Sequence, residues 1–341
     1  MGRLSKIKIL ALNNKAWDSL GEKEQFLIAY KIAAKRRAAL KKYPNVLAVG
    51  AGFRIKGRRG KLVREICIRI FVKRKWKSKR SRPGFIPAFF RIYHGKGKDR
   101  RKYEIPTDVN IIGKGRPTSN LNLTDGISVR DINGNLIASG SACCLVRRED
   151  TSDKYLLSCR HVLGNSNLSY NSPRIVYQGK TQIRIGVLVH SAPLIRSGFG
   201  GLDAAIATYD GLNNSIRVWS TYPNKVGEIT ELFGDFYVYG KKEVKRPNGS
   251  LIVRNGPLPA TFIGILMNYN FHCPNGLQFR IARAIQYKSA TEGGDSGAAL
   301  ISENGTLLGM HFFEDNLGQS YAMLADDIFN PNLFGMHITL A

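Results

Sequence analysis

The stretch Gly293-Gly-Asp-Ser-Gly-Ala-Ala-Leu300 is the most informative part of this chain. A serine hydroxyl is a poor nucleophile unless a base takes its proton, and the oxyanion that forms needs hydrogen-bond donors. Glycines on both sides of Ser296 allow a tight turn in which the amides of Gly294 and Ser296 point into one cavity. The stretch therefore predicts a nucleophilic serine beside an oxyanion hole.

Two further stretches supply the partners that such a serine needs. The stretch Leu156-Leu-Ser-Cys-Arg-His-Val-Leu163 ends a β-like run in His161, which places an imidazole at a strand end. In Gly201-Leu-Asp-Ala-Ala-Ile-Ala207, Asp203 stands at the mouth of an apolar strand, where a buried carboxylate can orient the imidazole. The sequence thus predicts a catalytic triad of His161, Asp203 and Ser296.

Short apolar runs recur around these stretches from about residue 127 onward, with turn signals such as Asn133-Gly134, Asn275-Gly276 and Asn304-Gly305. Helical periodicity is nearly absent until the last ~20 residues. Regularly spaced short strands predict an all-β barrel or sandwich. The runs are Ile127–Asp131, Leu136–Val146, Tyr155–Ser158, Arg174–Tyr177, Ile183–His190 and Ala204–Tyr209.

Residues 121–341 resemble the chymotrypsin-like (trypsin-fold) serine peptidases, in particular intracellular members of bacterial type. The matching motifs are LSCRHVL, LDAAIA and GGDSGAAL, and Gly140–Val146 fits the strand that precedes the histidine. The resemblance implies two six-stranded Greek-key β-barrels with the triad in the cleft between them. It also implies that Ser296 is the nucleophile, His161 the base and then the acid, and Asp203 the orienting group, with the Gly294 and Ser296 amides as the oxyanion hole.

Two residues near the serine resemble the specificity pocket of the glutamyl endopeptidases. Thr291 lies five residues before Ser296 and His311 fifteen after it. This implies binding of an acidic side chain before the scissile bond, although His311 also fits an ordinary half-buried strand histidine and Glu292 would repel an acid. Ala290 stands near the spot where a Lys/Arg preference needs Asp, so no such preference is expected.

The sequence also departs from the family pattern. The residues flanking the histidine are Arg160 and Val162, where alanine and cysteine are usual. In the zymogen branch, the residue at Asp295 pairs with a freshly cut N-terminus, and a cut before Ile127 could supply one. Intracellular relatives need no such cut, so both possibilities stay open.

The charge of the chain is divided very unevenly. Residues 1–120 hold 33 of the 52 Lys and Arg but 7 of the 25 Asp and Glu, a net charge of +26, whereas residues 121–341 carry +1. We therefore expect a domain boundary in the Gly- and Pro-containing stretch 113–120, between a basic module (1–120) and a peptidase domain (121–341).

The module itself has the pattern of a small α+β unit. Ser19-Leu-Gly-Glu22 fits a capping box before a helix over Glu22–Tyr43, which Pro44 ends. Two strands are expected over Val46–Phe53 and Val63–Val72, around a glycine-rich turn.

A module with this charge should attract polyanions: a nucleic acid, an anionic membrane or an acidic protein. The densest basic runs are Lys73–Arg80 and Lys96–Lys102, and Trp76 and Tyr93 could stack on bases, although no known nucleic-acid motif surrounds them. The alternatives are a soluble, highly charged surface, or an arm that docks on an acidic partner.

Other features limit the possible classes of protein. No stretch approaches the ~18 uninterrupted apolar residues of a membrane span. Five cysteines at irregular spacing suit a reducing compartment, so we expect a cytoplasmic protein with free thiols. The remaining histidines have no spaced partners, and we expect neither a metal nor a cofactor. These histidines are His94, His190, His272 and His337.

The sequence therefore predicts a serine endopeptidase acting on protein or peptide substrates, gated or targeted by its basic module. The alternative is a binding protein, either for nucleic acid or for another partner, in which the module is primary and proteolysis is conditional or lost.

Overall fold

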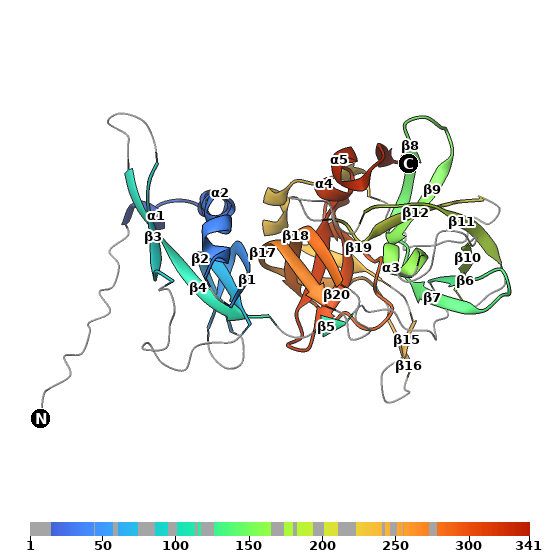
Figure 1. Ribbon diagram of the computed structural model, residues 1–341, viewed down its shortest axis with the longest axis horizontal. Helices are drawn as coiled ribbons and strands as arrows, with labels where there is room; N and C mark the ends of the chain where they lie inside the picture. The colour runs from blue at the N-terminus through green and yellow to red at the C-terminus, as the bar shows by residue number, and fades with distance from the viewer. Residues whose placement is uncertain are drawn as a thin grey trace, which may run out of the picture.

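The computed structural model describes most of the chain and is mainly β, with two large antiparallel-rich sheets (Figure 1). This confirms the predicted fold class. The described residues are 15–43, 45–56, 61–73, 86–94, 101–112, 115–116, 126–164, 174–179, 183–193, 201–210, 223–240, 243–245, 251–254, 256–272 and 278–341.

Six strands of the larger sheet close into a barrel. Their order is β14-β19-β20-β21-β18-β17, and β17 pairs back with β14 to complete the ring. Buried apolar side chains such as Val238, Ile285 and Leu300 pack together in its core. The strands are β14 (Phe236–Tyr239), β17 (Leu258–His272), β18 (Gln278–Lys288), β19 (Ala299–Ser302), β20 (Thr306–Asp315) and β21 (Ser320–Leu324).

The second sheet has eight strands in the order β22-β8-β9-β12-β11-β10-β6-β7. The run predicted over Leu136–Val146 is two strands, because residues 141–143 leave the sheet between β7 and β8. The strands are β6 (Ile127–Arg130), β7 (Leu136–Gly140), β8 (Cys144–Arg148), β9 (Lys154–Cys159), β10 (Ile175–Gln178), β11 (Arg184–Ser191), β12 (Ala204–Thr208) and β22 (Ile338–Leu340).

The N-terminal part is the expected α+β unit. Its helix α2 (Glu22–Lys41) follows a short α1 (Lys15–Asp18) and ends two residues earlier than predicted. The capping box is wrong: Gly21 is the N-cap residue, and no side chain caps the helix. The strands are β1 (Val46–Lys56), β2 (Lys61–Val72), β3 (Phe89–His94) and β4 (Arg101–Ile111).

This unit continues the sheet of the barrel. Residues 49–52 of β1 pair with residues 264–267 of β17, while residues 258–260 of the same strand pair with β14. Aromatic rings from both sides pack beside the junction: Phe26 of α2 and Phe53 of β1 meet Phe233 and Phe262. One strand thus serves both the barrel and the basic module, and the boundary proposed at 113–120 stays a prediction.

A buried cation also crosses this junction. Arg69 of β2 is fully buried, and its Nη1 donates to Gln286 Oε1 on β18. Glycines make room for the long side chain, since a Cβ at Gly264 would lie 2.9 Å from Arg69 Nη1. Gln286 in turn donates to the Tyr321 hydroxyl at 3.1 Å. The network therefore links the module to β21.

Short elements complete the fold. The predicted linker contributes β5 (Gly115–Arg116), which pairs with the end of β20. The others are α3 (Arg160–Leu163), β13 (Lys225–Val226), the 3-10 helix η3 (Ile229–Phe233), β15 (Glu243–Lys245), β16 (Leu251–Val253), α4 (Ala325–Ile328) and α5 (Pro331–Phe334).

Two sets of predictions fall wholly or mostly outside the described residues. These are the basic runs at 73–80 and 96–102, with Trp76, and the turn at Asn275-Gly276. Within the described residues, none of the helices has the length and apolar character that a membrane crossing requires.

Candidate active site

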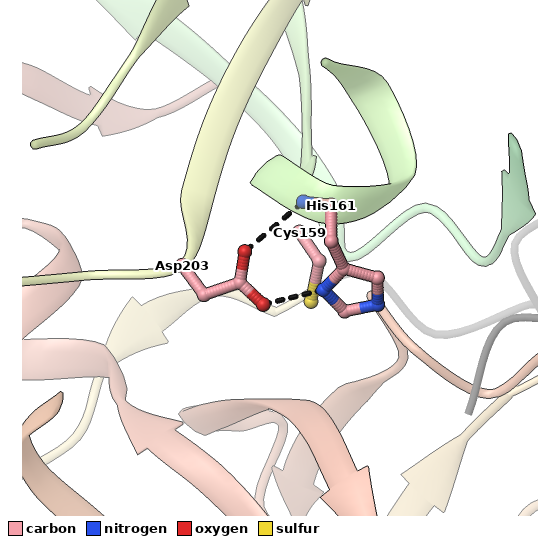
Figure 2. Close-up of side chains that lie close together, drawn as sticks. All are labelled: Cys159, His161 and Asp203. Carbon is pink, nitrogen blue, oxygen red and sulfur yellow. Dashed lines mark hydrogen bonds and ion pairs between the residues drawn. The ribbon is translucent and has the colours of Figure 1, made fainter. Parts of the chain in front are cut away.

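His161 and Asp203 meet because their strands are paired. Strands β9 and β12 run antiparallel with Cys159 opposite Ala204, so the residues just beyond these two ends come together. His161 lies on the one-turn helix α3 that follows β9, and its Nδ1 is 2.5 Å from Asp203 Oδ2 (Figure 2). The backbone N–H of His161 donates to Asp203 Oδ1 at 3.0 Å. Both carboxylate oxygens therefore hold the histidine.

The side chains of His161 and Asp203 are almost completely shielded from solvent. Asp203 is fully buried and His161 is 8% exposed. The backbone N–H of Arg160 donates to the Asp203 carbonyl at 3.0 Å, which fixes α3 against the loop before β12. A carboxylate in such a setting keeps the imidazole in one orientation.

Ser296 lies on the loop between β18 and β19. Gly294 and Gly297 on either side of it have φ values of 109° and 94°, which side-chain-bearing residues rarely adopt. Ser141, on the connection between β7 and β8, grips this loop through two hydrogen bonds, from its N–H to the Ser296 carbonyl at 2.7 Å and from its Oγ to the Gly294 carbonyl at 3.0 Å. The loop therefore docks on the eight-stranded sheet.

One carbonyl joins the serine loop to the histidine helix. The His311 carbonyl accepts from the Gly297 N–H at 2.8 Å and from Cys159 Sγ at 3.2 Å. Gly297 follows Ser296, and Cys159 lies two residues before His161. The structure thus pairs His161 with Asp203 and joins the loop that carries Ser296 to the strand end before His161 through one shared carbonyl. The Ser296 hydroxyl donates to the Phe312 carbonyl at 3.4 Å, and the Ser296–His161 contact stays a prediction, as does the oxyanion hole of Gly294 and Ser296.

Asp295 has a partner that sequence reasoning missed. Its Oδ1 accepts from Arg254 Nη1 at 2.7 Å, and its Oδ2 accepts from the Glu292 N–H at 2.8 Å. Arg254 Nη2 also donates to the Ala290 carbonyl at 3.3 Å. The guanidinium therefore clamps both ends of the turn before Ser296, and Gly240 is small enough to let the pair approach. No sequence signal marks Arg254, which is one of 52 basic residues.

The two expected pocket residues are both interior. His311 is fully buried, and its Nδ1 is 2.6 Å from the Tyr287 hydroxyl. Burial is the main cause that lowers the pKa of His311 to about 4, while Asp295 opposes the shift and His161 and Arg254 add to it. Thr291 is also buried, with its Oγ1 2.6 Å from Ser320 Oγ. A neutral His311 offers no positive charge to an acidic side chain, so the pocket stays a prediction.

Cys159 lies beside the histidine and aspartate, and the trio could be considered as metal ligands (Figure 2). Burial raises the pKa of the Cys159 thiol well above its usual range, and Asp203 adds to this. The thiol is thus protonated and donates to a carbonyl. Two ligands of a tetrahedral zinc ion lie about 3.3 Å apart or more, whereas the His161–Asp203 separation is 2.5 Å. The pair as it stands has room for a proton and not for an ion.

The other predicted features can be placed in part. Cys67, Cys143, Cys144 and Cys159 are free and buried, while Cys273 lies outside the described residues. His190 bonds the Phe334 carbonyl at 2.9 Å, and His337 is 3.3 Å from Glu149 at the surface.

Comparison with known proteins adds little. No protein-family model matches the chain, and no curated protein matches it. Among solved structures it is similar to the Rv3671c protease from M. tuberculosis. The active form has 18% identity and a TM-score of 0.35, over 62% of this chain and 80% of that one. The inactive form has 18% identity and a TM-score of 0.34, over 61% of this chain and 88% of that one. Scores this low carry no argument about function.

Proposed function

We propose that this chain is a serine endopeptidase in which Ser296, His161 and Asp203 hydrolyse peptide bonds through an acyl-enzyme. The observation that supports this best is the buried His161 Nδ1–Asp203 Oδ2 contact of 2.5 Å, one carbonyl away from the loop that carries Ser296. A histidine oriented by a carboxylate next to a serine on a strained turn is the arrangement that acyl transfer needs.

The first half of the reaction makes the acyl-enzyme. Ser296 Oγ attacks the carbonyl carbon of the peptide bond while His161 Nε2 takes the hydroxyl proton. The negative charge that forms on the substrate oxygen is stabilised by the Gly294 and Ser296 amides. The C–N bond then breaks, and the proton passes from His161 to the leaving amine.

The second half returns the enzyme to its starting state. Water attacks the ester carbonyl as His161 takes one of its protons, and the acid product leaves as that proton returns to Ser296 Oγ. Asp203 stays ionised in both halves, holding Nδ1–H and stabilising the imidazolium. Arg254 supports the same turn from behind through Asp295.

Covalent labelling tests the proposal. A fluorophosphonate should label the full chain once, at Ser296, and the Ser296→Ala variant should lose both the label and the peptidase activity. Ser289→Ala is the matched control, because Ser289 lies on the same loop and bonds the Pro259 carbonyl. Labelling that persists in Ser296→Ala, or none in the wild type, would favour the alternative of a binding protein without activity.

The side-chain preference is the second part of the proposal. A preference for Glu or Asp before the scissile bond rests on Thr291 and His311, and His311 would contribute a hydrogen bond from a neutral ring. A positional-scanning peptide library should then show cleavage after acidic residues. Cleavage after large apolar or basic residues would exclude this preference.

The basic module is proposed to target the enzyme. Figure 1 draws the barrel strands β18 and β20 between β1 to β4 on one side and α3, which carries His161, on the other. This arrangement supports recruitment of the enzyme to a partner over coverage of the active site by the described part of the module. A module that targets should leave the rate on a short peptide unchanged when its exposed charges are altered.

A further inference from the structure

The C-terminal half of helix α2 carries a dense, unmixed positive charge. Six of the twelve residues from Lys31 to Lys42 are Lys or Arg, and no Asp or Glu occurs anywhere from residue 25 to residue 64. At 100° per residue, Lys31, Lys35 and Lys42 fall on one stripe, opposite the buried Phe26, Ala33 and Leu40. All three lysines are exposed. They form a stripe about 16 Å long, at 1.5 Å per residue.

A second group of cations converges on the flank of the helix. Lys41 Nζ donates to the Asn268 carbonyl of β17 at 2.8 Å, and Arg37 lies one turn before it. Arg280 of β18 is opposite Asn270 in the same strand pair, which brings it close to Lys41. Burial and the charges of Arg280 and Arg37 all lower the pKa of Lys41. Arg280 Nε is buried and has no hydrogen-bond acceptor among the residues that the structure describes.

Several other cations in the described residues are matched with acids. Arg54 pairs with Glu65, Arg64 with Glu22 and Arg91 with Glu104. On the neighbouring part of β18, Arg283 pairs with Asp326 and Asp327. The dipole of α2 stabilises Lys41 and Lys42 at its C-terminal end, but no carboxylate accepts from Arg280 Nε in the part of the chain that the structure describes. The cations of this face are thus suited to an anion from outside.

We propose that the C-terminal half of α2, together with Arg280, binds the phosphodiester backbone of a nucleic acid. The partner is polymeric because the charges extend along the helix, which matches the closely spaced phosphates of a nucleic acid strand. Arg37, Lys41 and Arg280 form a site for one phosphate, and Lys31, Lys35 and Lys42 contact its neighbours. This inference stands apart from the peptidase proposal, since it uses none of the same residues.

Other anionic partners fit this face less well. A helix that lies on a membrane exposes apolar side chains beside its charged ones, whereas the apolar face of α2 is packed against the sheet and no large exposed hydrophobic residue belongs to it. An acidic protein presents carboxylates at scattered points and usually some basic groups among them, and the described part of α2 offers no acid beyond its first turn to pair with these.

The contacts are expected to be independent of base sequence. They involve phosphates rather than base edges, since no exposed aromatic side chain of α2 is available for stacking. The affinity should therefore fall steeply with salt, by a slope of roughly −0.9 in log K against log salt for each phosphate neutralised on duplex DNA.

Binding of the full chain to a labelled 25-base-pair DNA duplex and to the same sequence as duplex RNA tests the proposal, between 50 and 300 mM salt. A variant with Lys31→Gln, Lys35→Gln and Lys42→Gln should bind at least tenfold more weakly and lose about two to three units of salt slope. A second variant, Arg280→Gln, should lose about one unit. The matched control removes three exposed cations of the eight-stranded sheet and β18, with Arg147→Gln, Lys154→Gln and Lys288→Gln, and should bind like the wild type.

Three outcomes would overturn the proposal. The first is equal binding by the α2 variant and the control. The second is binding to phosphatidylserine vesicles or to polyglutamate with no binding to either duplex, which would identify a membrane or an acidic protein as the partner. The third is no binding of the wild type to DNA or RNA at 50 mM salt. Thermal melts of each variant confirm that it is folded.

Discussion

The counterion of Asp295 is the residue on which the geometry of the serine turn depends. The sequence alone left open a freshly cut N-terminus as its partner, and the structure has Arg254 there, 2.7 Å away and nearly buried. A full-length chain therefore already holds this carboxylate in place. No cut before Ile127 is needed for that purpose, and intact-mass measurement of active enzyme should find the uncut chain.

Removal of the Arg254 charge should reduce catalysis more than substrate binding. In Arg254→Met, the buried Asp295 loses its counterion and the turn carrying Gly294 and Ser296 loosens, so we expect kcat to fall about 100-fold with a smaller change in KM. Steady-state kinetics on a fluorogenic peptide measures both. Arg254→Lys should recover part of kcat, and a kcat equal to wild type in Arg254→Met would show that the clamp is dispensable.

His311 should make the stability of the protein depend on pH. Its folded pKa is about 4 and its ordinary value is 6.5, because the ring is buried. Between these values the unfolded chain binds a proton that the folded chain does not, so stability falls as the pH falls through 6.5 and levels off near 4. The free energy of unfolding should fall by roughly 3 kcal/mol over this pH range.

Urea unfolding at pH 4.5 and pH 7 measures this dependence. His311→Gln can still bond Tyr287 but cannot titrate, so its stability should change less between the two pH values than that of the wild type. Equal changes in the two proteins would assign the effect to another group.

At the residue scale, His161, Asp203 and Ser296 could each be proposed from a short local motif. The structure pairs His161 with Asp203, and the contact between Ser296 and His161 stays a prediction. Arg254, Ser141 and Cys159 contact the neighbourhood of these residues through tertiary structure alone. Nothing in the sequence next to these three residues distinguishes them from other arginines, serines and cysteines.

At the scale of elements, short apolar runs predicted strands well and their ends less well. Strand β12 begins at Ala204 as expected. The run at Leu136–Val146 is split, because residues 141–143 leave the sheet and Ser141 bonds the serine loop. The helix at Glu22 was predicted with the wrong cap, since a capping box is common by chance in a sequence. The length of β17 could not be foreseen, because its residues 264–267 pair with residues more than 200 positions earlier.

The junction between β1 and β17 is sensitive to added volume. A Cβ at Gly264 would lie 2.7 Å from the Ala51 carbonyl oxygen and 2.9 Å from Arg69 Nη1. Gly264→Val should therefore destabilise the protein by about 2 to 4 kcal/mol through strain and displacement of a buried cation. Thermal or urea unfolding measures this. Gly256→Ala is the control, because open space surrounds its Cβ position, and equal stability of the two variants would contradict the prediction.

At the scale of the whole molecule, we expect that the barrel does not fold stably without the basic module. A chain of residues 121–341 would expose the edge of β17 at residues 264–267 and the rings of Phe233 and Phe262, which pack on Phe26 and Phe53. An uncovered edge with apolar neighbours favours aggregation. We expect this fragment to be insoluble or to unfold well below the full chain, as chromatography and thermal melts will show.

A soluble monomeric fragment with the melting temperature of the full chain would contradict this expectation. It would also support the division at residue 120 that the charge distribution suggested. The charge pattern shows where the basic residues lie along the chain, whereas strand pairing decides which residues fold together, and the two need not divide the chain at the same place.

Because β17 is continuous, the basic module is attached rigidly to the barrel. A recruitment domain on a flexible linker would let its enzyme take many positions. Here, hydrogen bonds along one strand fix the orientation of a partner bound to the module relative to the barrel that holds Ser296. The distance between a partner bound to the module and the active site is then set by the fold. Proteins held at that distance and orientation would be cut, and equally susceptible chains lying elsewhere along the same partner would be spared.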